Sequence, residues 1–239
     1  MVSFVAITVF FMGKVTALEV QKRNKKRVNV FIDETYAFSL SLDEAAHLHK
    51  GQNLSDAEVD ALVNEAAITA ATESAARFLA LRPRSTQEVR QNLAKKGLSP
   101  AVIDATLERL IAFGYIDDRA FADVWVRDRM TYKPSSPRAL RYELRQKGIS
   151  SDVIDAALAD LDAEDAAYQA AQAQSRRLRG TSRRDFQNKL GAFLQRRGFS
   201  YGQARTVIRR LMQELDADQP DFFSGDTDET EANETDLIE

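Results

Sequence analysis

Residues 82–116 read RPRSTQEVRQNLAKKGLSPAVIDATLERLIAFGYI and decide the fold. Gly97 suits the left-handed position that ends a helix, and Ser99 suits the N-cap of the next helix. Apolar residues at 103, 107 and 110 fall on one face of that second helix. The stretch therefore predicts two short helices joined at a basic Lys-Lys-Gly corner.

The same pattern returns around Gly148 and Gly198, at spacings of 51 and 50 residues. Each copy has a Leu four residues before the Gly, a basic residue directly before it, and an apolar residue and a Ser directly after it. Matches at many fixed offsets predict three copies of one unit. A further helix precedes each pair, near 72–81, 118–132 and 162–179, and Ser85, Ser136 and Ser182 are suited to cap the second helices.

The N-terminal part has a different period. Residues 28–32 and 36–40 alternate apolar and polar side chains, and turn-forming residues stand at Asn24 and Asp33-Glu34. This predicts a three-stranded antiparallel meander with the basic run 21–27 at a hairpin tip. Ser41 or Asp43 then starts a short helix through His49. Ser55 and Glu58 form a capping box for a long helix to about Leu81, with Leu54 on its apolar side.

We therefore expect a mostly α-helical fold, with three tandem three-helix repeats in an elongated curved array after a small β meander and a long helix. The expected parts are 1–54 for the meander and short helix, 55–117 for the long helix and first repeat, 118–161 for the second repeat, 162–215 for the third repeat, and 216–239 for an acidic disordered tail. The apolar leader 1–12 is either a strand or a mis-assigned start, with Met12 as the alternative first residue.

Charge is distributed unevenly. Residues 76–215 carry 26 Lys and Arg against 16 Asp and Glu, and residues 166–215 alone carry 11 against 2. Residues 216–239 carry ten acidic residues and no basic one. A basic body with an acidic tail points to an anionic partner. The tail either folds back on the basic third repeat as a competitor for DNA or serves solubility only.

No enzyme chemistry is indicated. The chain has no Cys, and its two histidines, His47 and His49, lie on different helix faces with no Cys or carboxylate pattern of a metal or catalytic site around them. Asp117 and Asp118 suit a helix N-terminus, and Trp125 lies in an apolar run that suits core packing. We expect no catalytic residue, no metal, no cofactor and no membrane span, in a cytoplasmic protein that is a monomer.

Three segments together resemble the RecX family of bacterial regulators: RPRSTQEVRQNLAKKG, GYIDDRAFADVWVRDR and SPRALRYELRQKGIS. The resemblance covers about residues 14–215, and the third repeat matches less literally. It implies tandem three-helix repeats that bind the RecA recombinase, lodge in the groove of the RecA–DNA filament, and modulate its recombinase and coprotease activities, with inhibition as the expected direction. Recombination, DNA repair and the SOS response are the implied setting.

A surface built from basic residues of all three repeats is the expected contact with the filament, and the third repeat is the expected electrostatic anchor. The candidate residues are Arg82, Arg84, Arg90, Lys95, Lys96, Arg127, Arg138, Arg141, Arg145, Lys147, Arg183, Arg184, Arg196, Arg197, Arg205 and Arg209. Direct DNA binding is the alternative. Against it, the sequence offers no recognition helix with clustered Asn, Gln and Arg, and the third helices of the first two repeats expose acidic residues.

Overall fold

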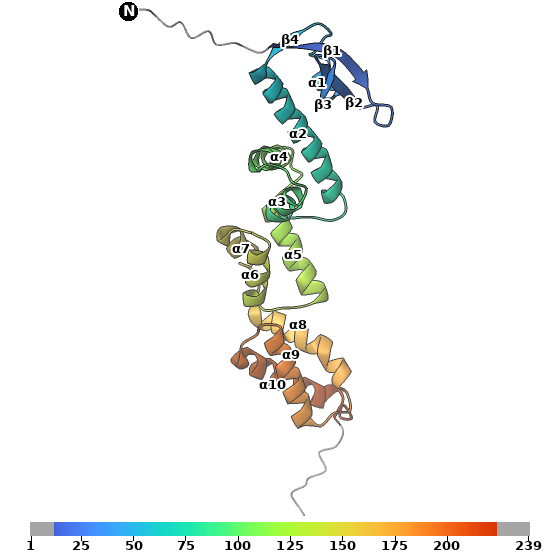
Figure 1. The fold of residues 1–239 in the computed structure, drawn as a ribbon. Coiled ribbons are helices and arrows are strands. Elements are labelled where there is room, and N and C mark those ends of the chain that lie inside the picture. Colours follow the sequence, from blue (N-terminus) through green and yellow to red (C-terminus); the bar gives the residue numbers. More distant parts are fainter. Residues whose placement is uncertain (1–11, 224–239) are drawn as a thin grey trace, which may run out of the picture. The chain divides into compact units, whose positions relative to one another are not determined.

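The computed structural model describes residues 12–223 and divides into two compact units, Met1–Asp117 and Asp118–Glu239 (Figure 1). The first unit holds a small sheet, a long helix and one helix pair. The second unit holds two groups of three helices. The apolar leader and most of the acidic tail lie outside the described residues.

The sheet has four antiparallel strands in the order β3-β2-β1-β4. Their bounds are β1 Met12–Val20, β2 Arg27–Ile32, β3 Thr35–Ser41 and β4 Asn53–Ser55. The predicted three-stranded meander is confirmed, and Asp33 and Glu34 form its tight turn with φ of 49° and 66°. The fourth strand was not predicted. Leu54 belongs to it, pairs with Gly13 and is 2% exposed, so its assignment to the long helix is wrong.

Two capping boxes follow the sheet. Ser41 caps α1 (Leu42–Ala45) with Glu44, so this helix is shorter than the sequence suggested. Ser55 caps α2 (Asp56–Leu79) with Glu58, as predicted. Along α2, Ala66 is buried in the core of the sheet, whereas Ala71 and Ala75 are buried in the core of the first helix pair. One helix therefore supports both parts of the first unit.

Three helix groups follow the predicted repeat. The first pair is α3 (Thr86–Ala94) and α4 (Pro100–Ala112), packed on α2. The second group is α5 (Asp118–Tyr132), α6 (Pro137–Gln146) and α7 (Ser151–Ala157). The third group is α8 (Ala163–Ser175) with the short helix η1 (Arg176–Leu178), α9 (Arg183–Arg196) and α10 (Tyr201–Asp218).

The corners of the three groups confirm the predicted roles of Gly and Ser. Gly97, Gly148 and Gly198 have φ of 77°, 78° and 86°, in the left-handed region that favours glycine. The Ser residues predicted as caps occupy the N-cap of α3, α4, α6, α7, α9 and α10. One part of the pattern fails: α7 ends at Ala157, so Leu158 and Leu161 follow the helix instead of extending its face.

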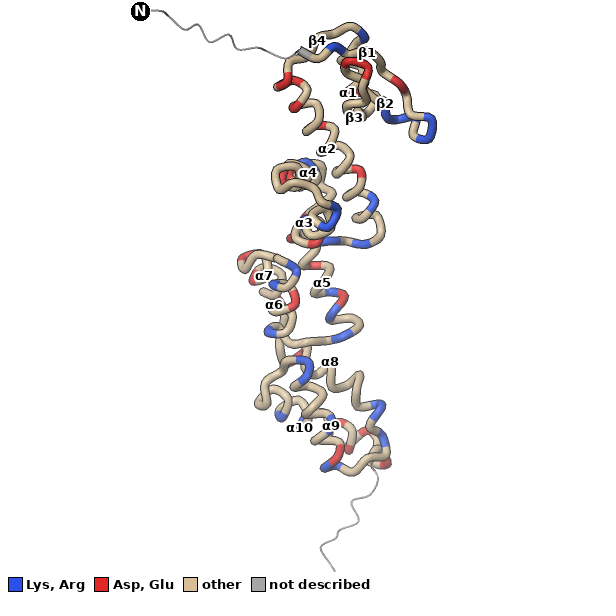
Figure 2. Tube along the Cα trace, viewed as in Figure 1, with Lys and Arg blue, Asp and Glu red and all other residues tan. Residues whose placement is uncertain are grey.

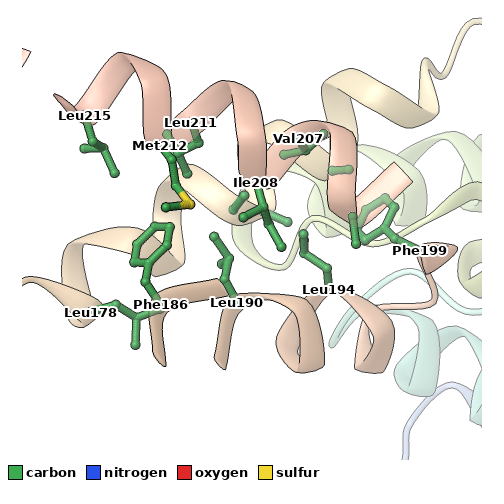
Figure 3. Close-up of a cluster of buried hydrophobic side chains, with 14 of the residues drawn as sticks. Leu178, Phe186, Leu190, Leu194, Phe199, Val207, Ile208, Leu211, Met212 and Leu215 are labelled. Atoms are coloured by element: carbon green, nitrogen blue, oxygen red, sulfur yellow. The ribbon is translucent and has the colours of Figure 1, made fainter. Parts of the chain in front are cut away.

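The core of the third group extends beyond residue 215. Phe186, Leu190 and Leu194 of α9 face the apolar side of α10 (Figure 3). Phe222 and Phe223 close this core against Phe186, with ring centroids 5.7 and 5.2 Å away. The core of the third group therefore includes the aromatic pair, which lies beyond residue 215.

The second and third groups meet at a defined junction. The Ser136 amide donates to the Arg197 carbonyl at 3.0 Å, and the Arg197 guanidinium donates to the Pro134 carbonyl at 3.3 Å. Gly198 lies so close that a Cβ built on it would be 2.6 Å from the Ser136 hydroxyl and 2.9 Å from the Cβ of Ala139. The corner of the third group is thus docked on the N-terminus of α6.

Candidate partner-binding surface

Most predicted contact residues of the first unit already have a partner within the chain. Arg82 pairs with Glu88 at 3.0 Å, and Arg90 pairs with Asp104 at 2.5 Å. The guanidinium of Arg84 lies 4.1 Å from the centroid of the Phe78 ring, and Lys96 donates to the Ser74 hydroxyl. The Lys95 side chain is exposed and makes no ion pair, hydrogen bond or ring contact among residues 12–223.

The second group divides in the same way. Arg138, Arg141 and Arg145 share one face of α6 as predicted, but Arg141 pairs with Asp155 at 2.5 Å. The Lys147 ammonium lies 5.1 Å from the Trp125 ring centroid. Arg127, Arg138 and Arg145 are exposed and form no ion pair within the described part of the chain.

Trp125 is a packing residue, as its apolar surroundings predicted. Its ring stacks on Phe121 at 5.8 Å, and its indole N–H donates to Glu143 at 2.9 Å. The Arg129 guanidinium covers the ring at 4.4 Å and pairs with Glu143 at 2.7 Å. With its polar atom and at least one face engaged, the indole is poorly placed to stack on a nucleic-acid base.

Among the three helix groups, the third presents the largest set of cations without an ion pair within residues 12–223. Arg184, Arg196, Arg205 and Arg209 are exposed and form no ion pair with any other described residue. Arg176, Arg177 and Arg179 near the end of α8 are exposed and unpaired in the same sense. Lys and Arg positions recur along this group in Figure 2. These side chains keep their charge available for a partner.

Two predicted residues of the third group have structural duties. Arg183 pairs with Asp216 at 2.7 Å and lies 4.7 Å from the Phe223 ring centroid. Arg197 is committed to the junction with Pro134 and is partly buried. Burial lowers its pKa, and the nearby Arg129 guanidinium adds to this effect while Glu143 opposes it. Arg197 is therefore a poor candidate for contact with a partner.

A groove of about 470 Å³ runs between α9 and α10. Its apolar floor includes Gly191, Ile208 and Met212. Its polar rim combines amides with cations, namely Gln187, Asn188, Gln195, Arg205, Arg209 and Gln213. The sequence offers no such cluster of Asn, Gln and Arg on a single recognition helix, whereas this one is built by two helices.

The groove marks a break in the repeat. Seven residues before and seven after the corner glycine, the first two groups carry the ion pairs Arg90–Asp104 and Arg141–Asp155, each at 2.5 Å. The equivalent positions of the third group are Gly191 and Arg205. Gly191 stands where the first two groups have the Arg that reaches the last helix, and Arg205 stands where they have the Asp. An alignment on the three glycines contains this signal.

Among the described residues, no group of three His, Cys, Asp or Glu side chains is arranged to hold a metal ion. No helix within residues 12–223 is long and apolar enough to cross a membrane.

Four family models match the chain in order. They are the RecX N-terminal domain at residues 13–55 and the first, second and third RecX three-helix domains at 71–110, 117–158 and 162–208. The chain belongs to the RecX family. "Regulatory protein RecX" of Clostridium botulinum strain Alaska E43 is 34% identical over 208 residues, covering 84% of this chain and 97% of its own length. The protein of that name from Lactobacillus delbrueckii strain ATCC BAA-365 is 34% identical over 216 residues, covering 87% and 78%.

Solved structures of RecX proteins share the fold. One crystal structure of regulatory protein RecX superposes with a TM-score of 0.65 at 26% identity and covers 82% of this chain and 98% of its own. The crystal structure of RecX from Lactobacillus salivarius gives a TM-score of 0.53 at 25% identity, covering 62% and 97%. The mostly helical fold with three RecX three-helix domains is thereby confirmed.

The match to the third-domain model stops before the end of the third helix group. The third-domain model ends at residue 208, within α10. Arg209, the end of α10 and the pair Phe222–Phe223 lie beyond it. The residues that line the groove therefore lie on both sides of the end of this match, and the pair Phe222–Phe223 lies wholly beyond it.

Proposed function

We propose that this protein is a cytoplasmic regulator that binds the RecA recombinase on DNA and inhibits its recombinase and coprotease activities, in recombination, DNA repair and the SOS response. Membership of the RecX family supports this proposal. The exposed, unpaired arginines of the third group support placing the contact with RecA-coated DNA on that group. No step of this proposal requires catalysis or a cofactor.

The unpaired arginines suit a nucleoprotein filament because it presents phosphates and acidic side chains at a regular spacing. Each such contact releases counterions or gains Coulomb energy, so binding weakens as salt rises. Arginines that are already paired with a carboxylate contribute less, since the partner carboxylate would have to be displaced first. We therefore assign the contact to Arg184, Arg196, Arg205 and Arg209, supported by Arg127, Arg138 and Arg145 of the second group.

The test compares two double variants on DNA coated with RecA and ATP at moderate salt. Arg184→Gln with Arg196→Gln removes two unpaired cations and is expected to lower the affinity about tenfold. Arg82→Gln with Arg141→Gln removes two cations that already have carboxylate partners, and we expect less than about a twofold loss. Equal losses would contradict the assignment, and no loss in either variant would place the contact elsewhere.

Direct DNA binding is the second candidate, and the amide and arginine rim of the α9–α10 groove favours it. The first two groups argue against it because their last helices expose Asp104, Glu108, Asp152 and Asp155. Binding to bare DNA and to RecA-coated DNA is to be measured under the same conditions. Preference for the coated DNA supports the regulator, and equal binding supports the DNA-binding protein.

A further inference from the structure

We propose that the acidic residues 224–239 of this chain bind in the α9–α10 groove, with a carboxylate placed over Gly191 beside Arg205. The tail would then shield the basic surface of the third group from its partner. Three independent observations support this: the missing ion pair, the position at which the chain leaves the third group, and the charge of the segment that follows.

The missing ion pair defines what the groove accepts. In the first two groups, an Arg of the second helix reaches across to an Asp of the third helix at 2.5 Å. In the third group, Gly191 has no side chain to cross the groove, and Arg205 lines the same groove with no ion pair among residues 12–223. A carboxylate entering from outside would restore a pair of the same kind with the signs exchanged. Arg209 follows one helical turn later, so an extended acidic segment meets two cations in sequence.

The aromatic pair places the start of the tail beside this groove. Gly180 donates its amide to the Phe222 carbonyl at 2.9 Å, and Phe223 packs on Phe186, next to the groove residue Gln187. The Arg183 guanidinium lies over the Phe223 ring and pairs with Asp216, which lines the near end of the groove. Asp216 is neutralised by this pair, so it opposes an acidic occupant only weakly.

The length and charge of the tail match the groove. Residues 224–239 contain seven Asp and Glu and no Lys or Arg. The stretch of α9 from Gln187 to Gln195 rises about 12 Å, whereas eight extended residues after Phe223 span about 26–29 Å. The first half of the tail is therefore long enough to pass the whole groove, including Arg205 and Arg209.

Disulfide trapping in the full chain tests the docking, because the protein has no Cys of its own. Glu231→Cys is combined with Gln195→Cys at the far rim of the groove, or with Gln172→Cys as the control. Gln172 is exposed and lines a separate hollow together with Phe222, so it lies near the point where the tail begins. Simple tethering therefore favours the control, whereas docking favours the groove by at least about fivefold in the rate of cross-linking.

Charge variants in the same background locate the interaction. Arg205→Glu with Arg209→Glu is expected to abolish the preference for Gln195→Cys, and so is ~1 M salt, at which charges are screened beyond ~3 Å. Arg177→Glu with Arg184→Glu makes the same charge change outside the groove and is expected to keep most of the preference. Cross-linking without preference overturns the proposal. It is also overturned if the groove variant weakens binding to single-stranded DNA while the cross-linking is unchanged, since the groove would then be a nucleic-acid surface.

The regulatory consequence rests on the proposed binding to RecA-coated DNA, whereas the cross-linking experiment contains no RecA. Replacing the seven tail carboxylates by Asn and Gln is expected to raise the affinity for the coated DNA at low salt by about threefold to tenfold. Selective cross-linking with unchanged affinity would overturn the shielding role and retain the docking. If the proposed function itself is wrong, neither the parent protein nor any of the variants will bind the coated DNA.

Discussion

Gly198→Ala is expected to disrupt the junction between the second and third helix groups. Gly198 has φ of 86°, and an added Cβ would stand 2.6 Å from the Ser136 hydroxyl and 2.9 Å from the Cβ of Ala139. The hydroxyl is held because it accepts the Ala139 amide at 3.1 Å as the cap of α6. The Cβ of Ala139 is fixed to the helix backbone. Neither neighbour is able to move away without cost.

The expected magnitude has two parts. A left-handed conformation costs an L-residue about 1–2 kcal/mol. Forcing a methyl group into a packed site adds about 1–3 kcal/mol, so the junction is expected to lose about 2–5 kcal/mol. Gly97→Ala is the matched control because Gly97 has φ of 77° and no heavy atom within 4 Å of its Cβ position. Gly97→Ala is therefore expected to cost only the about 1–2 kcal/mol of the left-handed conformation.

Amide hydrogen exchange at Ser136 reads the junction directly, because this amide donates to the Arg197 carbonyl at 3.0 Å. A loss of about 2 kcal/mol accelerates its exchange by about thirtyfold. Gly97→Ala is expected to leave this amide unchanged. Adding Ser136→Gly to Gly198→Ala removes the hydroxyl at a cost of only a few tenths of a kcal/mol in capping, and it should restore part of the protection. Equal exchange in Gly198→Ala and the parent protein would refute the docked corner.

Two further predictions concern the ends of the described chain. Phe223→Ala is expected to destabilise the third group by about 3 kcal/mol in urea unfolding, since the ring is 9% exposed and packs 5.2 Å from Phe186; an unchanged midpoint would place the aromatic pair outside the core. Burial favours a higher pKa for Glu44, but hydrogen bonds from Thr69 and Ser41 outweigh it and hold the pKa below its ordinary value. The free energy of unfolding of the first unit, which holds the sheet, should therefore decrease as the pH falls below about 4.3. Glu44→Gln should reduce this pH dependence in urea unfolding at a series of pH values.

Local chemistry made much of the fold predictable. A helix end needs a left-handed residue and a capping side chain within a few positions, so Gly and Ser mark the corners in the sequence itself. The failures are non-local. Strand β4 (Asn53–Ser55) forms because Leu54 pairs with Gly13, 41 positions earlier in the chain. Three residues alone are too few to show a period in the sequence. Phe222 and Phe223 stand in an acidic stretch after α10, and their burial depends on packing against Phe186 of α9.

The candidate site was harder to predict because an arginine looks the same in sequence whether it is paired or free. Arg90 and Arg141 meet carboxylates fourteen residues later, on another helix, so spacing along one helix does not reveal the pairs. Arg197 was included as a contact residue because of its charge, but its backbone and side chain hold the junction. What the sequence did indicate is the excess of positive charge in the third repeat, where the exposed unpaired arginines are concentrated.

The single Trp of the chain gives this protein a built-in optical probe. Trp125 lies beneath Arg129, and both Arg129 and Glu143 influence the Arg197 guanidinium of the docked corner electrostatically. Separation of the second and third groups would withdraw that cation and alter the polarity around the indole. The fluorescence emission wavelength of Trp125 should therefore report, in the unlabelled protein, whether the two groups stay docked while the protein binds RecA-coated DNA.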